Sequence, residues 1–72
     1  MISDQVRRGI KISLIHENTN VVKAAIASGV PKSAIYRFMS GSNDINIVKL
    51  DKFCRLGLNR TLMQVLELGQ GK

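Results

Sequence analysis

Residues 21–41 read VVKAAIASGVPKSAIYRFMSG, and this stretch decides the fold of the chain. Asn20 precedes it and is suited to cap a helix that Gly29 then stops, because glycine readily adopts the left-handed conformation of a helix end. Pro31 follows closely, and its fixed φ and missing N–H favour the first turn of a second helix over about 32–40. The stretch therefore predicts two short helices joined by a tight turn.

The apolar and small residues of this stretch fit a helix-turn-helix. That motif needs a small residue where its helices touch, a residue tolerant of positive φ at the turn, and buried apolar residues after the turn and along the second helix. These positions are occupied, in order, by Ala25, Gly29, Val30, Ile35 and Phe38. We therefore expect these five residues to form the core of a helix-turn-helix motif.

A helical pattern also precedes the motif. Val6, Ile10 and Leu14 recur at helical spacing, and Ser3 is placed to cap the helix that carries them. The alternation of Ile10, Ile12 and Leu14 is also typical of a strand, but the chain has no second strand-like run to pair with it. A helix is therefore favoured here.

Two more helices are expected after the polar loop at 42–44. The first ends at Gly57, and the second follows Asn59 as its cap and leads to a frayed tail at 69–72. The apolar residues that mark them are Val48, Leu50, Phe53, Cys54 and Leu56, then Leu62, Met63, Val65, Leu66 and Leu68. Because a chain of 72 residues is too short for two cores, we predict one all-α domain of five helices over 1–72.

Composition restricts the partners of this domain. With 44% hydrophobic residues the chain lacks the signature of disorder, and its formal net charge of +6 favours a polyanion, either nucleic acid or an anionic membrane surface. The single cysteine, Cys54, allows no internal disulfide, and the N-terminus has no secretory signal pattern. No uncharged stretch is long enough to span a bilayer. We expect a cytoplasmic protein that does not cross a membrane.

No catalytic or metal-binding pattern is present in the sequence. His16 and Cys54 have no second His or Cys at ligand spacing, whereas zinc needs three or four protein ligands. The acidic residues are scattered over different predicted helices and loops, and no glycine-rich phosphate loop occurs. We expect no enzyme, metal, cofactor or small-molecule substrate.

The stretch 21–41 resembles the lambdoid phage repressor and Cro proteins and their wider bacterial relatives, including Gly41, which closes the second helix of the motif. The resemblance extends more weakly to the helix before the motif and to LDKFCRLGL at 50–58. It implies a compact five-helix, lambda-repressor-like domain that places the second motif helix in the major groove of double-stranded DNA. Ala24 and Ser28 depart from the larger apolar residues usual in the family, which predicts looser packing of the first motif helix.

The residues expected to contact DNA follow from the helical period. With Ile35 and Phe38 turned inward, the outer face of the second motif helix carries the predicted base-reading residues, which are Lys32, Ser33, Tyr36 and Arg37. Lysine and arginine donate to guanine O6 and N7, serine pairs with a base or a phosphate, and tyrosine contacts a thymine methyl or a phosphate. The predicted backbone contacts are Lys23, Ser40, Ser42, Asn43 and Lys49. The alternative interpretation is an ordinary solvated helix face followed by turn-forming residues.

A homodimer is the expected assembly, because the C-terminal region has more apolar residues than one face of a short helix can bury. The predicted interface residues are Leu58, Leu62, Met63 and Leu66. The hypothesis is a sequence-specific transcription regulator, more often a repressor, that binds a pseudo-palindromic operator. Two alternatives are a protein-interaction module on the same scaffold, such as an antirepressor or inhibitor, and a basic membrane-surface helix. The spread of basic residues over all helices argues against the latter.

Overall fold

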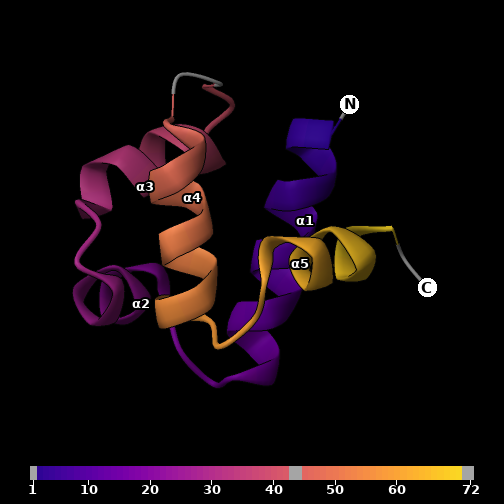
Figure 1. The fold of residues 1–72 in the computed structure, drawn as a ribbon, viewed down its shortest axis with the longest axis horizontal. Helices are drawn as coiled ribbons and strands as arrows, with labels where there is room; N and C mark the ends of the chain where they lie inside the picture. The colour runs from indigo at the N-terminus through magenta and orange to yellow at the C-terminus, as the bar shows by residue number, and fades with distance from the viewer. Residues whose placement is uncertain (1, 43–44, 71–72) are drawn as a thin grey trace.

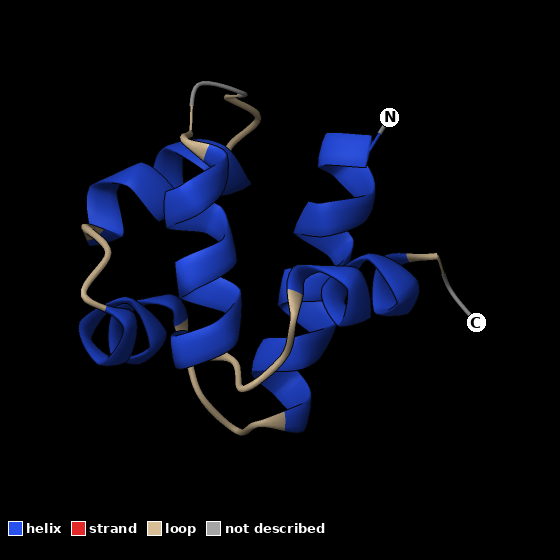
Figure 2. Ribbon diagram, viewed as in Figure 1, coloured by secondary structure: helices blue, strands red, loops and turns tan. Residues whose placement is uncertain are grey.

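Helices make up most of the chain that the structure describes, namely residues 2–42 and 45–70 of a computed structural model (Figures 1 and 2). In chain order the elements are α1 (Ile2–His16), α2 (Val21–Ser28), α3 (Lys32–Met39), α4 (Ile47–Lys52), a π-helical turn η1 (Phe53–Gly57) and α5 (Leu62–Gly69). Those residues contain no strand. The predicted compact, all-α fold class is confirmed, and the alternating segment 10–14 lies within α1.

Both predicted ends of α2 are confirmed. Asn20 is the N-cap, and its side-chain oxygen accepts a hydrogen bond of 2.9 Å from the backbone N–H of Lys23. Gly29 ends the helix with φ of +74°, where a side chain would be strained, and its N–H donates to the carbonyl of Ala25 at 2.9 Å.

Two other predicted caps are wrong. The helix α1 already begins at Ile2, so Ser3 lies inside its first turn. The cap of α5 is Thr61, because its hydroxyl accepts from the N–H of Gln64 at 3.1 Å while the Gln64 side chain accepts from the N–H of Thr61 at 2.9 Å. This reciprocal capping box satisfies two N–H groups, whereas Asn59 has φ of +55° in the preceding turn.

The helices surround one core (Figure 1). The helices α1 and α5 cross on one side of the molecule, α2 and α3 occupy the other, and α4 with η1 runs down the layer nearest the viewer. Every helix and the π turn contribute to the core. The buried apolar residues are Val6, Ile10, Ala24, Ala25, Val30, Ile35, Phe38, Leu50, Phe53, Cys54, Leu58 and Val65.

Glycines allow α1 and α5 to pack backbone against backbone. A Cβ built on Gly9 would lie 1.9 Å from the carbonyl oxygen of Val65, and one on Gly69 would lie 1.8 Å from that of Gln5. The Gln5 amide also donates to the carbonyl of Leu66 at 2.8 Å. Gly69 is therefore buried at the end of α5, and the predicted frayed tail is wrong at this residue; residues 71–72 of that tail lie outside the described chain.

The predicted loose packing of α2 is also wrong. Ala24 is small because η1 passes directly over it: a Cβ on Gly57 would lie 2.7 Å from the Ala24 carbonyl oxygen and 3.1 Å from its Cβ. Ser28 is buried, but its hydroxyl donates to the carbonyl of Ala25 at 3.1 Å, so no polar group is left unsatisfied there.

The π turn changes which residues of the fourth helical segment face the core. Val48 and Leu56 fit the predicted apolar pattern, but both are exposed. A π turn holds one more residue than an α turn, so Phe53 and its neighbour Cys54 both point inward and Leu56 is carried round to solvent. The inner face of this segment consists of Leu50, Phe53 and Cys54.

Candidate nucleic-acid interface

The helices α2 and α3 are joined by a turn of three residues, Gly29, Val30 and Pro31. The N–H of Val30 donates to the carbonyl of Ala25 at 3.2 Å, which completes the end of α2, and the Val30 side chain is buried. Pro31 precedes the first residue of α3 and lacks an N–H that would be left unpaired there. The turn therefore holds α3 at a fixed position relative to α2.

The helix α3 has one buried side and one exposed side. Ile35 and Phe38 are buried, and Ala25 and Val30 join them in the same core. The four predicted base-reading residues are all exposed on this helix; they are Lys32, Ser33, Tyr36 and Arg37. The structure therefore brings together two cations, a hydroxyl and a phenol on a helix whose opposite side is anchored.

The predicted backbone-contacting residues are distributed around this helix. Lys23 on α2, Ser40 after α3 and Lys49 on α4 are exposed. Ser42 is half-buried, and its carbonyl accepts a hydrogen bond from Arg7 at 3.0 Å. Asn43 lies outside the described residues.

One further cation near the α2–α3 turn was missed by the sequence reasoning. The Nζ atom of Lys52 lies 3.8 Å from the position that a Cβ on Gly29 would occupy. This places an ammonium from α4 at the C-terminal end of α2, where the helix dipole favours a positive charge. Residues 21–42 themselves contain no Asp or Glu, and Lys52 adds a further positive charge beside this stretch. No local pattern indicated this, because α4 is distant from Gly29 in the chain.

Arg7 on α1 holds the C-terminal end of α3, which the sequence also did not indicate. Its guanidinium donates to the carbonyl of Phe38 and to that of Ser42, and it lies 4.7 Å from the centre of the Phe38 ring. Asp4 pairs with the same guanidinium at 2.8 Å. A cation at a helix C-terminus donates to the last carbonyls of the helix and interacts favourably with the negative end of its dipole. Arg7 therefore fixes both α3 and the turn that follows it.

Replacement of Arg7 by methionine is expected to lower the free energy of unfolding by about 1.5–3 kcal/mol, the usual contribution of a hydrogen bond to a charged group. Methionine keeps an apolar stem against Phe38 but loses the hydrogen bonds to both carbonyls. Urea denaturation measures the change. Arg8→Met is the control, because Arg8 is exposed on the same helix. Equal losses in the two variants would contradict the role given to Arg7.

The predicted dimer residues have unequal exposure. Leu58 is fully buried in the core, so its assignment to an interface is wrong: the turn after η1 directs it inward. Leu62 and Leu66 are half-buried against the same core, and Met63 is exposed. Only Met63 among the four presents most of its side chain to solvent.

Comparisons with models of protein families, with curated proteins and with solved structures gave no match. Any functional conclusion therefore depends on the site itself.

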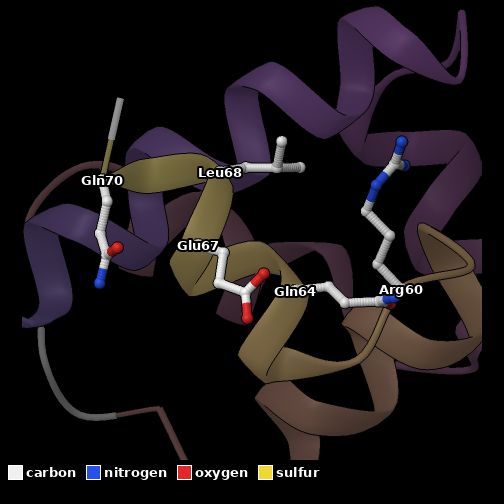
Figure 3. Close-up of a pocket in the computed structure, with 5 residues that line it drawn as sticks. All are labelled: Arg60, Gln64, Glu67, Leu68 and Gln70. Carbon is white, nitrogen blue, oxygen red and sulfur yellow. The ribbon is translucent and has the colours of Figure 1, made fainter. Parts of the chain in front are cut away.

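A shallow hollow of about 590 Å³ along α5 does not form a ligand site (Figure 3). It is lined by Arg60, Gln64, Glu67, Leu68 and Gln70. Glu67 and Leu68 point in different directions, the Gln64 side chain is engaged in capping α5, and Arg60 is 3.1 Å from a Glu17 carboxylate oxygen. The lining side chains therefore do not converge on a common ligand.

Reactive chemistry is not supported at Cys54 either. Burial, with a smaller contribution from the negative charge of Asp51, raises the pKa of the Cys54 thiol to about 12. At neutral pH the thiol is protonated, so it is a poor nucleophile and a poor metal ligand. Within residues 2–42 and 45–70, no group of three His, Cys, Asp or Glu residues is placed to hold a metal ion. No helix in those segments has the length and apolar character needed to cross a membrane.

Proposed function

We propose that this protein is a sequence-specific DNA-binding transcription regulator whose α2–α3 pair is a lambda-repressor-like helix-turn-helix. The observation that carries the proposal is the two-sided character of α3. Its inner side is anchored by Ile35 and Phe38, and its outer side exposes Lys32, Tyr36 and Arg37. An anchored helix with exposed donors is what base reading in a major groove requires.

The outer side of α3 has the chemistry for base recognition. The Arg37 guanidinium forms a planar fork that fits guanine O6 and N7, and Lys32 donates to the same acceptors. Ser33 lies beside Lys32 in the first turn of α3, where it reaches a base edge or a phosphate. Tyr36 supplies an apolar ring for a thymine methyl and a hydroxyl for a phosphate.

The charges around the motif favour approach to a phosphate backbone. Lys23, Lys49 and Lys52 come from α2 and α4 and are exposed, and residues 21–42 carry no carboxylate that would repel DNA. Such a predominantly positive surface accelerates encounter with a polyanion. Selection of bound sequences from a random duplex pool tests the proposal, which predicts enrichment of a pseudo-palindromic site. Failure to enrich any sequence would contradict it.

Arg37→Ala and Lys23→Ala are expected to differ in kind. Loss of Arg37 should cost about 1–3 kcal/mol on the selected site and relax the preference at one base pair, because it removes a base contact. Loss of Lys23 should weaken binding to all sequences alike, because phosphates carry no sequence information directly. Titrations on selected and scrambled duplexes measure both effects. Equal losses on both duplexes for Arg37→Ala would make it a phosphate contact.

A protein-interaction module on the same fold is the alternative. Ile26 on α2 is exposed, and it borders a shallow, mainly apolar hollow at the α2–α3 turn together with Val22 and Pro31. Exposed apolar residues at such a position are typical of a protein contact. Binding to random duplex DNA at low salt distinguishes the two functions, since a protein-binding module need not bind DNA.

A further inference from the structure

An exposed face of α4 and η1 combines apolar and charged side chains. Val48 and Leu56 are 70% and 54% exposed. Asp51 and Arg55 lie between them and form an ion pair of 3.2 Å. Together with Lys52 these residues line one shallow hollow of about 250 Å³. We call Val48, Asp51, Arg55 and Leu56 the α4 face.

The α4 face presents two exposed apolar side chains, Val48 and Leu56, whereas α5, where the sequence predicted the dimer contact, presents one, Met63. On α5 only Met63, at 66% exposure, is fully available, since Leu62 and Leu66 already pack against the core. Apolar side chains at an unfilled surface are stabilised when a partner covers them. These exposures favour α4 over α5 as the dimer contact.

We propose that the α4 face is the contact through which two copies of this chain associate. A two-fold contact must be complementary to itself, and this face has both halves of each pair it needs. With the two α4 helices antiparallel, Val48 meets Leu56 of the second copy, and Asp51 meets Arg55 of the second copy. The hollow beside Leu56 gives room for the apolar side chain from the other protomer.

Like charges do not block this arrangement. Lys52 lies near the middle of the face in sequence, and two copies of an ammonium on a two-fold axis would repel each other. However, the Lys52 Nζ is directed toward the end of α2, 3.8 Å from the position of a Cβ on Gly29. The charges remaining on the face are Asp51 and Arg55, which are of opposite sign.

The α4 face is also compatible with DNA binding by both protomers, a link that depends on the proposed function. In Figure 1 no described segment lies in front of α4, and α2 and α3 lie along one edge of the molecule. A two-fold axis in the plane of that view, running across α4, keeps both α3 helices on the same edge of the dimer.

Sedimentation of the purified chain at tens of micromolar tests the contact. We expect the wild type to be a dimer, and Val48→Glu and Leu56→Glu to be folded monomers with unchanged circular dichroism, because both side chains are exposed. Met63→Glu is the matched control on α5 and should stay dimeric. A monomeric wild type, dimeric Val48→Glu and Leu56→Glu variants, or dissociation by Met63→Glu would overturn the proposal.

A charge exchange tests the predicted pairing directly. Asp51→Arg alone should give a monomer, because the new arginine at position 51 of each protomer would meet Arg55 of the other protomer and the two cations would repel each other. The double variant Asp51→Arg with Arg55→Asp should restore the dimer, since the opposite signs are present again. Failure of the double variant to dimerise, while it keeps the wild-type circular dichroism, would reject the antiparallel pairing.

Binding of DNA by the same variants separates failure of this contact from failure of the proposed function. The monomeric variants should bind the selected pseudo-palindromic site about 10²–10⁴-fold more weakly than the wild type, because the second α3 is no longer delivered by the first. Their binding to a single half-site should be unchanged. If the wild type bound no duplex, the proposed DNA-binding function would be contradicted. The sedimentation results would still show whether two copies associate through the α4 face.

Discussion

The affinity of this protein for duplex DNA is expected to fall by about 10³–10⁵-fold when salt rises from about 50 to 200 mM. A dimer of this fold should make roughly 6–10 phosphate contacts, and each contact releases a condensed counterion from the DNA. The exposed cations available for these contacts lie on α2, α3 and α4, and no carboxylate lies within residues 21–42. Titrations of a random duplex at several salt concentrations measure the slope.

Single variants give this experiment its control. Lys23→Gln should reduce the slope of log affinity against log salt by about one for each protomer, because it removes a phosphate contact. Lys11→Gln should leave the slope unchanged, since α1 lies on the other side of the molecule from α2 (Figure 1). Salt-independent binding by the wild type, or equal slopes for Lys23→Gln and the wild type, would contradict the proposed interface.

Gly9→Ala is expected to destabilise the fold by more than about 3 kcal/mol, beyond the ~1–3 kcal/mol usual for an overpacked core. The added Cβ would lie 1.9 Å from the carbonyl oxygen of Val65, and backbone atoms cannot give way as a flexible side chain does. The helices α1 and α5 would have to separate. This loss far exceeds the ~1 kcal/mol that alanine gains over glycine in helix propensity.

Thermal and urea denaturation followed by circular dichroism measure this loss. Lys11→Ala is the control, because it lies on the exposed side of the same helix and changes propensity without adding a buried atom. A Gly9→Ala variant as stable as the wild type would show that α1 and α5 do not approach as closely as the structure has them.

The sequence by itself determined where most helices lie, because the signals at their ends are local. Asn20 and Gly29 bound α2 through contacts within four residues in the chain, and Pro31 precedes α3 for an equally local reason. The burial of Ile35 and Phe38 follows from the helical period. That period also placed the candidate DNA-contacting residues on the exposed side of α3.

The sequence pattern was not sufficient to predict helix caps and buried sides where two local signals competed. Thr61 with Gln64 forms a capping box that is readable in the sequence, yet Asn59, whose residue type also caps helices, was predicted instead. The π turn has no comparable signal, so Leu56 was expected on the core side and Leu58 on the dimer contact. One additional residue in a helical turn rotates the side chains that follow it about the helix axis, so a pattern that assumes 3.6 residues per turn places them on the wrong side.

Only the tertiary structure decided which distant residues meet. Arg7 holds the end of α3 across 31 residues of chain, and Lys52 reaches Gly29 from another helix. Gly9 is required where it is only because the backbone of Val65 passes against it. Such contacts depend on how whole helices cross, and the crossing is set by the shape of all the packed side chains together. Periodicity reports which side of a helix is buried, but not which helix covers it.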